Sequence, residues 1–181
     1  NMSNMFNSEI ITIYTDGAAR GNPGRGGFAS IIVFGKEKVL EVGGKSEYTT
    51  NNKMELQGAI RGLSLAYSEN NFGIKKMQVY TDSKYVLQGI TEWIHGWKKN
   101  NWKTSAKKEV LNQDLWRTLD DLVSTIKSGG YDIAWTYVKG HSDNVFNARA
   151  DEIATTCADD TALIDGEEKY FFNDVFVNWR Q

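Results

Sequence analysis

The sequence is poor in the features that mark secreted, zinc-binding and membrane proteins. Its 181 residues include a single cysteine, Cys157, which excludes an internal disulfide framework and any multi-cysteine zinc site. No segment approaches the length of a membrane span, and residues 1–9 lack a basic stretch followed by an apolar run. We therefore expect a monomeric protein of the reducing cytoplasm that has no contact with membranes.

An excess of charge of one sign is also lacking. The formal net charge is −2, so any attraction to nucleic acid must come from a local patch. A composition that is 40% hydrophobic and 12% aromatic suits one compact domain with a single core. We predict that this domain spans residues 10–158, between a flexible N-terminus over 1–9, where Asn1 ahead of Met2 is typical of a vector remnant, and an extension over 159–181.

The spacing of apolar residues predicts the order of strands and helices. Three β-branched and aromatic runs come first, over 10–15, 28–34 and 39–45, and the glycine-rich stretch 21–27 predicts a turn. The elements predicted after them are a helix over 54–69, a strand over 76–81, a helix over 83–90, a helix over 115–126, a strand over 133–138 and a helix over 145–157. This order predicts a mixed α/β fold with a five-stranded sheet, its first three strands antiparallel, and helices packed on both faces.

Four acidic residues fall on elements that should meet at one edge of this sheet. They are Asp16 at the end of the first strand, Glu55 in the first helix, Asp82 at the end of the fourth strand and Asp151 in the final helix. Carboxylates brought together repel, and burial adds to the cost, so that without a cation some would hold protons. Oxygen ligands favour magnesium or manganese over zinc. Each acid alone is explained more simply as a strand end or a solvated helix face, and only the set predicts a metal site.

Short motifs around these acids resemble the signature blocks of ribonuclease H, and the bacterial type 1 enzymes in particular. The blocks are TDG at 15–17 with GNPG at 21–24, TTNNKME at 49–55, YTDS at 80–83, the stretch 85–116, VKGH at 138–141 and the segment 147–154. Each block is short, but their order and spacing are not generic, and they cover roughly residues 11–158. The resemblance implies a ribonuclease H-like fold and an endonuclease that hydrolyses the RNA strand of RNA–DNA hybrids.

The same resemblance assigns roles to the candidate catalytic residues. It implies that Asp16, Glu55, Asp82 and Asp151 hold two Mg²⁺ ions, or Mn²⁺ in their place, during in-line attack of water. The products would carry 5′-phosphate and 3′-hydroxyl ends. A lone histidine in the loop 140–144 would more simply be structural, but the family motif suggests that His141 transfers a proton or assists product release near the scissile phosphate.

A basic segment over residues 97–108 supplies the local patch that the net charge does not. It contains no acid and five lysines, which are Lys98, Lys99, Lys103, Lys107 and Lys108. Trp97 and Trp102 are interleaved with them, which favours a surface that grips a phosphate backbone over an ordinary solvated loop. In the resembled enzymes this segment is a basic protrusion that contacts the DNA strand, and such contacts give affinity without sequence preference.

Discrimination of RNA from DNA requires contact with the 2′-hydroxyl through the wide minor groove. Asn22 and Asn51 match family positions near the hybrid, although turn and cap roles suit them equally well. Thr50 resembles a family residue that binds a DNA phosphate and is also a candidate N-cap. Lys84 and Asn147 complete the predicted substrate contacts.

Two positions depart from the family pattern. Val33 stands where the bacterial enzymes carry an arginine that helps to bind a DNA phosphate, and Lys84 replaces a glutamine. We expect a weaker phosphate pocket, which Lys84 could offset. Beyond residue 158 the resemblance fades, and the extension mixes acids with apolar residues in the partial alternation of a strand or short hairpin.

Two other functions stay open. One is a module that binds hybrids or double-stranded RNA and has lost catalysis, and the other is an integrase-like core for DNA strand transfer. The presence of all four acids argues against the first. The basic segment and the pair Asn51 and Asn52 argue against the second, because they resemble hybrid-binding features.

Overall fold

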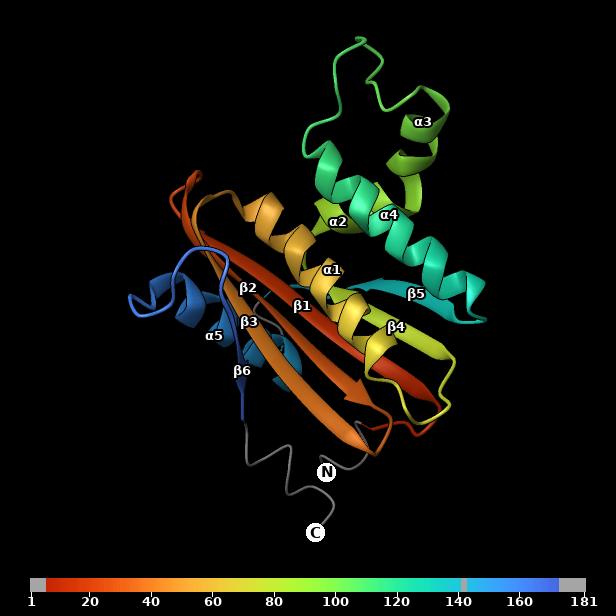
Figure 1. The fold of residues 1–181 in the computed structure, drawn as a ribbon, viewed down its shortest axis with the longest axis vertical. Coiled ribbons are helices and arrows are strands. Elements are labelled where there is room, and N and C mark those ends of the chain that lie inside the picture. Colours follow the sequence, from red (N-terminus) through yellow and green to blue (C-terminus); the bar gives the residue numbers. More distant parts are fainter. Residues whose placement is uncertain (1–5, 141–142, 173–181) are drawn as a thin grey trace.

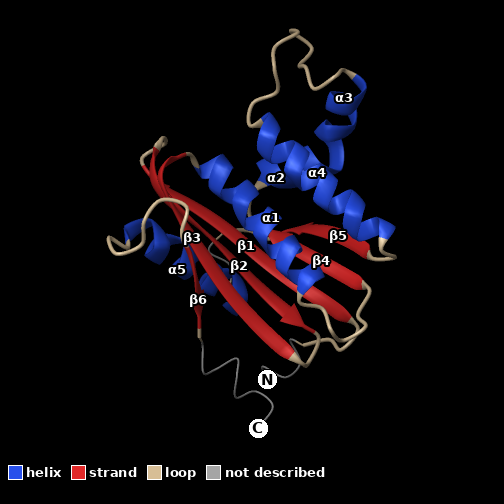
Figure 2. Cartoon of the chain, in the orientation of Figure 1, coloured by secondary structure: helices blue, strands red, loops and turns tan. Residues whose placement is uncertain are grey.

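The computed structural model describes residues 6–140 and 143–172, which form a mixed sheet with helices on both faces (Figures 1 and 2). The strands are β1 (Ile10–Arg20), β2 (Gly24–Phe34), β3 (Lys38–Thr49), β4 (Lys76–Thr81), β5 (Asp132–Tyr137) and β6 (Glu168–Phe171), in the spatial order β5-β4-β1-β2-β3-β6. β1, β2 and β3 are antiparallel neighbours, β4 runs parallel to β1, and β5 runs parallel to β4. The predicted architecture is confirmed, except that the sheet has six strands instead of five.

The β1–β2 hairpin is longer than predicted. Pairing continues as far as Arg20 and Arg25, so the turn is confined to residues 21–23 instead of 21–27. Gly27 consequently lies inside β2, where a side chain would clash with the backbone of Ala154 in the helix above it. We had predicted Asp16 at the end of the first strand. It lies within the strand instead, because β1 continues to Arg20.

The described part of the chain contains five α-helices. They are α1 (Asn51–Ser68), α2 (Lys84–Gln88), α3 (Ile94–Lys99), α4 (Gln113–Ser128) and α5 (Val145–Asp159). α1 and α4 lie on one face and α5 on the other (Figure 1). A π-helical turn, Gly89–Trp93, joins α2 to α3, where the sequence predicted a single helix over 83–90. The bare backbone of Gly89 leaves room there for the ring of Trp116. No helix in the described part of the chain has the length and apolarity of a membrane span.

Apolar side chains form a core on each face, because residues alternate between faces along each strand. The core under α1 and α4 includes Ile11, Ile13, Phe34, Leu63 and Trp116. The core under α5 includes Phe6, Tyr14, Ile31, Val33, Phe146 and Ile153. Val33 is only 3% exposed, so its side chain contributes to packing and does not line a phosphate pocket. Phe6, which precedes the predicted boundary at Ile10, is 5% exposed and packs in the same core, and the domain bounds stay a prediction.

The C-terminal extension contributes the sixth strand. β6 pairs antiparallel with residues 41–44 of β3 and covers the edge that β3 would otherwise expose. Arg61 on α1 forms a 2.9 Å ion pair with Glu168, and Phe171 packs against the α5 core. The partial alternation seen in the sequence thus corresponds to a short edge strand.

We predict that Gly27→Ala lowers the melting temperature, because the added methyl group would push α5 away from β2. Overpacking of this kind costs roughly 1–3 kcal/mol of unfolding free energy. Gly96→Ala is the matched control, since a Cβ at Gly96 in α3 would have no atom within 4 Å. Thermal unfolding of both variants checks the prediction, and equal melting temperatures would contradict it.

Candidate active site

Three of the four predicted carboxylates meet beside the C-terminal end of β4. Asp16 lies in β1, Glu55 in the second turn of α1, and Asp82 directly after β4, and each offers an oxygen within 4.8 Å of the others. β1 and β4 are parallel neighbours, so Asp16 and Asp82 follow strand residues that are paired with each other. Glu55 approaches Asp16 because Gly17 has no side chain. A Cβ at Gly17 would clash with the backbone nitrogen of Glu55.

Two members of the cluster, Asp16 and Glu55, are buried, and the pKa values of both are raised. Asp16 is 5% exposed and Glu55 is 8% exposed. Burial, followed by the negative charge of Asp82, raises the pKa of Asp16 to about 7. Burial, followed by the charge of Asp16, raises the pKa of Glu55 well above its ordinary value. Asp16 accepts a 2.8 Å hydrogen bond from the N–H of Gly17, whereas Oε2 of Glu55 has no partner among the described residues. Buried carboxylate oxygens that lack hydrogen-bond donors are suitable ligands for a hard divalent cation.

The fourth predicted acid, Asp151, lies apart from the three clustered carboxylates. Asp151 lies on the exposed face of α5, outside the group of three oxygens. Its charge still helps to raise the pKa of Asp16, as the smallest of the contributions that do so. His141 lies outside the described residues. The loop before it does reach the cluster, since a Cβ at Gly140 would lie 3.4 Å from Oδ2 of Asp82.

Polar residues of the hairpin and of the start of α1 are linked to one another. Oδ1 of Asn51 accepts a 2.8 Å hydrogen bond from the N–H of Ala19, and Oδ1 of Asn22 accepts one of 3.1 Å from the N–H of Asn51. The hydroxyl of Thr50 accepts from the N–H of Lys53 at 3.2 Å and caps α1. Turn and cap roles are thus present at all three predicted positions, and their contacts with substrate stay predictions.

Thr50 and Asn22 also line a shallow cavity of about 320 Å³. Its other lining residues are Asn52, Lys53, Leu111 and Asn112. Neither Lys53 nor Asn112 was among the predicted site residues. Asn112 precedes α4 with a left-handed φ of 58° and donates a 3.1 Å hydrogen bond to the hydroxyl of Tyr85. Because Asn112 is far from Thr50 along the chain, only the packing of α4 beside α1 brings them together.

The basic segment is less uniformly cationic than its composition indicated. Lys98 forms a 3.2 Å ion pair with Asp120 of α4, and Lys103 forms one of 2.6 Å with Glu109, one residue beyond the segment. The other three lysines, Lys99, Lys107 and Lys108, are exposed and have no ion pair within the described chain. Two of the five predicted positive charges are therefore neutralised locally.

The two tryptophans of the basic segment hold it against α4. Trp102 is 8% exposed and lies 4.9 Å under the guanidinium of Arg117. The ring of Trp97 lies 5.3 Å from that of Trp116 in the core. The burial of Trp102 argues against its predicted contact with substrate, which stays untested.

The remaining predicted contacts differ in their accessibility. Lys84 is exposed at the start of α2, with Nζ 5.5 Å from the ring centre of Tyr137. Asn147 is 6% exposed, and its N–H donates a 2.9 Å hydrogen bond to the capping side chain of Asn144. Lys84 is thus free to reach a ligand, whereas Asn147 lies within the packed start of α5.

Comparison with known proteins identifies close relatives. Residues 8–159 match the family model described as RNase H. A curated protein of Cyanothece sp. named ribonuclease H is 49% identical over 153 residues, which are 84% of this chain and 92% of that protein. Another of the same name, from Thermosynechococcus vestitus, is 50% identical over 147 residues, which are 81% of this chain and 87% of that protein.

Solved structures have the same fold. LC9-RNase H1, described as a type 1 RNase H with the type 2 active-site motif, aligns with a TM-score of 0.72 at 23% identity and covers 95% of this chain and 81% of its own. LC11-RNase H1 in complex with an RNA/DNA hybrid aligns with a TM-score of 0.58 at 26% identity and covers 82% of this chain and 96% of its own. At 23% identity, the first of these likenesses concerns the fold alone.

We predict that Asp16→Asn stabilises the metal-free protein at alkaline pH. Folding raises the pKa of Asp16 to about 7, so the folded state binds more protons than the unfolded chain below that pH. Stability therefore falls as pH rises from the ordinary pKa of aspartate to about 7, and the asparagine removes this loss. The gain should be a few kcal/mol at about pH 8, since each pKa unit corresponds to about 1.4 kcal/mol, and small at about pH 4.

Thermal unfolding in a chelator at the two pH values measures this gain. Added Mg²⁺ should raise the melting temperature of the wild type at about pH 8 more than that of Asp16→Asn. The ion would offset the negative charge of the Asp16 carboxylate, which the variant lacks. A variant that is less stable than the wild type at both pH values would contradict the electrostatic explanation.

Proposed function

The chain belongs to the ribonuclease H family, and we propose that it is an endonuclease that hydrolyses the RNA strand of RNA–DNA hybrids. The observation that carries the proposal is the cluster of Asp16, Glu55 and Asp82 in a chain about half identical to two curated ribonucleases H. A structural neighbour at 26% identity was solved with an RNA/DNA hybrid. A module that only bound hybrids would gain nothing from three mutually repelling acids, which makes the non-catalytic alternative the weaker one.

A divalent cation suits this cluster better than protons do. We propose Mg²⁺, with Mn²⁺ as an alternative, because both prefer oxygen ligands and the donor set contains no nitrogen or sulfur. Asp16, Glu55 and Asp82 would hold it, with Asp151 on the neighbouring helix as the fourth acid. When bound, such an ion makes water a stronger nucleophile at neutral pH and offsets negative charge on the phosphate.

The remaining chemistry is a proton transfer that the protein itself can assist. Attack of water on phosphorus breaks the bond to the ribose 3′-oxygen and leaves 5′-phosphate and 3′-hydroxyl ends. We propose that His141 exchanges a proton near this phosphate or promotes release of the product, because an imidazole changes its charge near neutral pH.

Recognition of the RNA strand would come from amide donors. The side-chain oxygens of Asn22 and Asn51 each accept a backbone hydrogen bond, which leaves both amide N–H groups of each side chain available to donate to a ligand. Such groups donate well to a 2′-hydroxyl oxygen, which DNA lacks. We therefore propose that these two residues favour RNA at the strand beside the carboxylates.

The DNA strand would be held by phosphate contacts at the cavity that Asn22 borders. The cavity lined by Thr50, Lys53 and Asn112 combines a hydroxyl, an ammonium group and an amide, which suits a phosphate oxygen. The exposed lysines of the basic segment would extend this surface. A larger adjoining cavity of about 630 Å³ contains both lysines and acids, including Lys45, Asp114 and Asp165, and does not suit a phosphate backbone.

We also propose that the protein acts as a monomer in the cytoplasm. The single buried cysteine is compatible with a reducing compartment. The carboxylate cluster is formed within one chain and needs no residue from a second copy.

A cleavage assay tests the proposed function. With Mg²⁺, the wild type should cut the RNA strand of a hybrid and leave matched RNA–RNA and DNA–DNA duplexes intact. Asp16→Asn should lose most turnover and keep most hybrid affinity, because its charge is needed for the ion more than for docking. Near wild-type cleavage by Asp16→Asn would contradict the proposal, and cleavage of the DNA duplex would favour the strand-transfer alternative.

A matched pair of lysine variants tests the basic segment. Lys99→Ala should flatten the slope of log affinity against log salt by about 0.7–0.9, the effect of one lost phosphate contact. Lys98→Ala should change it less, because Asp120 at 3.2 Å already offsets that charge. Turnover at saturating hybrid should hardly change in either variant, since the contact acts equally in ground and transition states. Parallel salt lines for both variants and the wild type would show that the lysines only solvate the surface.

A further inference from the structure

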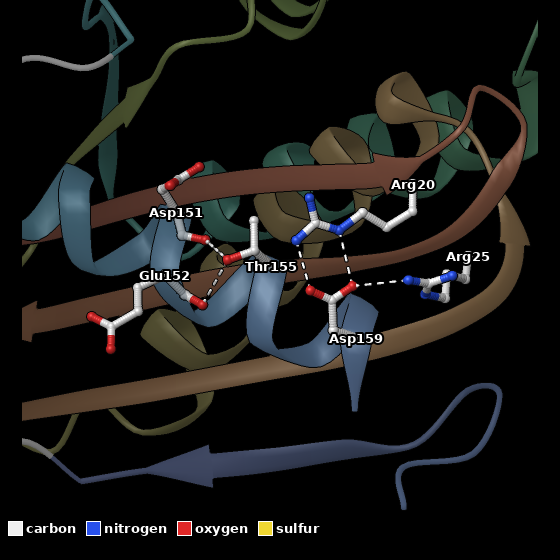
Figure 3. A network of polar contacts seen from close by, with 6 residues as sticks. All are labelled: Arg20, Arg25, Asp151, Glu152, Thr155 and Asp159. Carbon is white, nitrogen blue, oxygen red and sulfur yellow. Dashed lines mark hydrogen bonds and ion pairs between the residues drawn. The ribbon is translucent and has the colours of Figure 1, made fainter. Parts of the chain in front are cut away.

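A second cationic group lies near the carboxylates, at the tip of the β1–β2 hairpin. Arg20 and Arg25 face each other across the hairpin, and both contact Asp159, the last residue of α5 (Figure 3). Nε and Nη2 of Arg20 donate to the two oxygens of Asp159 at 2.9 and 2.6 Å. Arg25 makes a single contact of 3.3 Å with the same carboxylate. None of the roles proposed above uses these residues.

Arg20 and Asp16 lie on the same strand and project to the same face. Side chains alternate along a strand, so every second residue shares a face, and Tyr14 and Ala18 of this set pack against the α5 core. At about 3.3 Å per residue, the backbone of Arg20 lies about 13 Å along β1 from that of Asp16. Asp151, two turns before Asp159 on α5, also acts on Arg20 and adds to the effect of Asp159 in raising the pKa of its guanidinium. A strand of nucleic acid that passes the carboxylates along β1 would therefore meet Arg20.

The guanidinium of Arg20 is oriented but not saturated. Asp159 engages two of its five N–H groups along one edge, and no other acceptor in the described chain contacts it. The side chain is 44% exposed. A guanidinium held in one orientation binds a phosphate with a smaller loss of conformational freedom than a mobile side chain would.

Stability alone is a poor explanation of this contact. Exposed ion pairs contribute little to the unfolding free energy, typically about 0–1 kcal/mol. α5 is already fixed to the sheet by Phe146 and Ile153 in the core and by the bidentate pair of Arg149 with the buried Glu41. Its position does not depend on Arg20.

We propose that Arg20, oriented by Asp159, binds a backbone phosphate of the RNA strand to one side of the scissile phosphate. The inference rests on the proposed function, because the strand that passes the carboxylates is the strand that is cut. α5 and α3 lie on opposite sides of the molecule (Figure 1), so Arg20 and the basic segment would contact different strands. Arg20 is on this view a binding residue and takes no part in the chemical step.

Steady-state kinetics of Arg20→Ala test the contact. The KM for a hybrid should rise about tenfold, the scale of one lost hydrogen-bonded phosphate contact, with kcat changed by less than about twofold. The salt slope should flatten by about 0.7–0.9. Lys36→Ala is the matched control, because it removes the same charge from an exposed turn at the opposite end of β2, and it should change none of these quantities.

The strand assignment is tested by shortening the substrate one strand at a time. Removal of RNA nucleotides from the side that faces Arg20 should weaken binding by the wild type. It should weaken binding by Arg20→Ala much less, because both changes remove the same contact. Shortening of the DNA strand at that end should weaken both proteins equally. Coupling to the DNA strand instead of the RNA strand would overturn the proposal.

One further variant separates the charge of Arg20 from its two-pronged geometry. Arg20→Lys keeps the charge and loses the two-pronged contact with Asp159, so its KM should lie between those of the wild type and Arg20→Ala. A fall in kcat with KM unchanged would mean that Arg20 acts only through the placement of α5, and would overturn the inference. Equal KM values for Arg20→Ala and Lys36→Ala in a protein that cleaves hybrids would overturn the inference alone, whereas no cleavage by the wild type would overturn the proposed function as well.

Discussion

The repulsion among Asp16, Glu55 and Asp82 is the constraint on which the rest of this structure depends. Three carboxylates within 4.8 Å of one another are unfavourable, and burial makes them more so. The cluster persists because its members belong to rigid elements: β1 and β4 are paired in parallel, and α1 packs directly on Gly17. A core on each face of β1 prevents the strand from moving away. A bound divalent cation would relieve this repulsion.

α5 connects the predicted chemistry to the predicted recognition of substrate. It carries Asp151 on its exposed face, is anchored by the pair of Arg149 with the buried Glu41, and ends at Asp159, which holds Arg20 (Figure 3). One helix thus carries an acid whose charge acts on Asp16 and orients a cation farther along β1. The basic segment lies on the opposite side of the molecule from α5 (Figure 1), so the two strands of a hybrid would meet surfaces of different chemistry.

Local sequence patterns predicted the elements well and their ends poorly. The glycine-rich stretch 21–27 has the composition of a turn, yet only residues 21–23 form one, because Gly27 is needed for the close approach of α5 to β2. The single helix predicted over 83–90 is followed by a π-helical turn where Gly89 accommodates Trp116. In both cases the glycine makes room for a residue that is distant in sequence. A local pattern cannot distinguish such a glycine from one that forms a turn or ends a helix.

The sequence by itself determined the family, the strand and helix order, and the acids that form the cluster, because these are written in short motifs and in the alternation of apolar residues. Only the tertiary structure decided which charges remain available. It pairs Lys98 with Asp120, buries Trp102, and leaves Asp151 outside the three closest carboxylates. It also joins Arg20 to Asp159. Electrostatic interaction depends on distance in space, and residues far apart along the chain become neighbours only when the helices pack against the sheet.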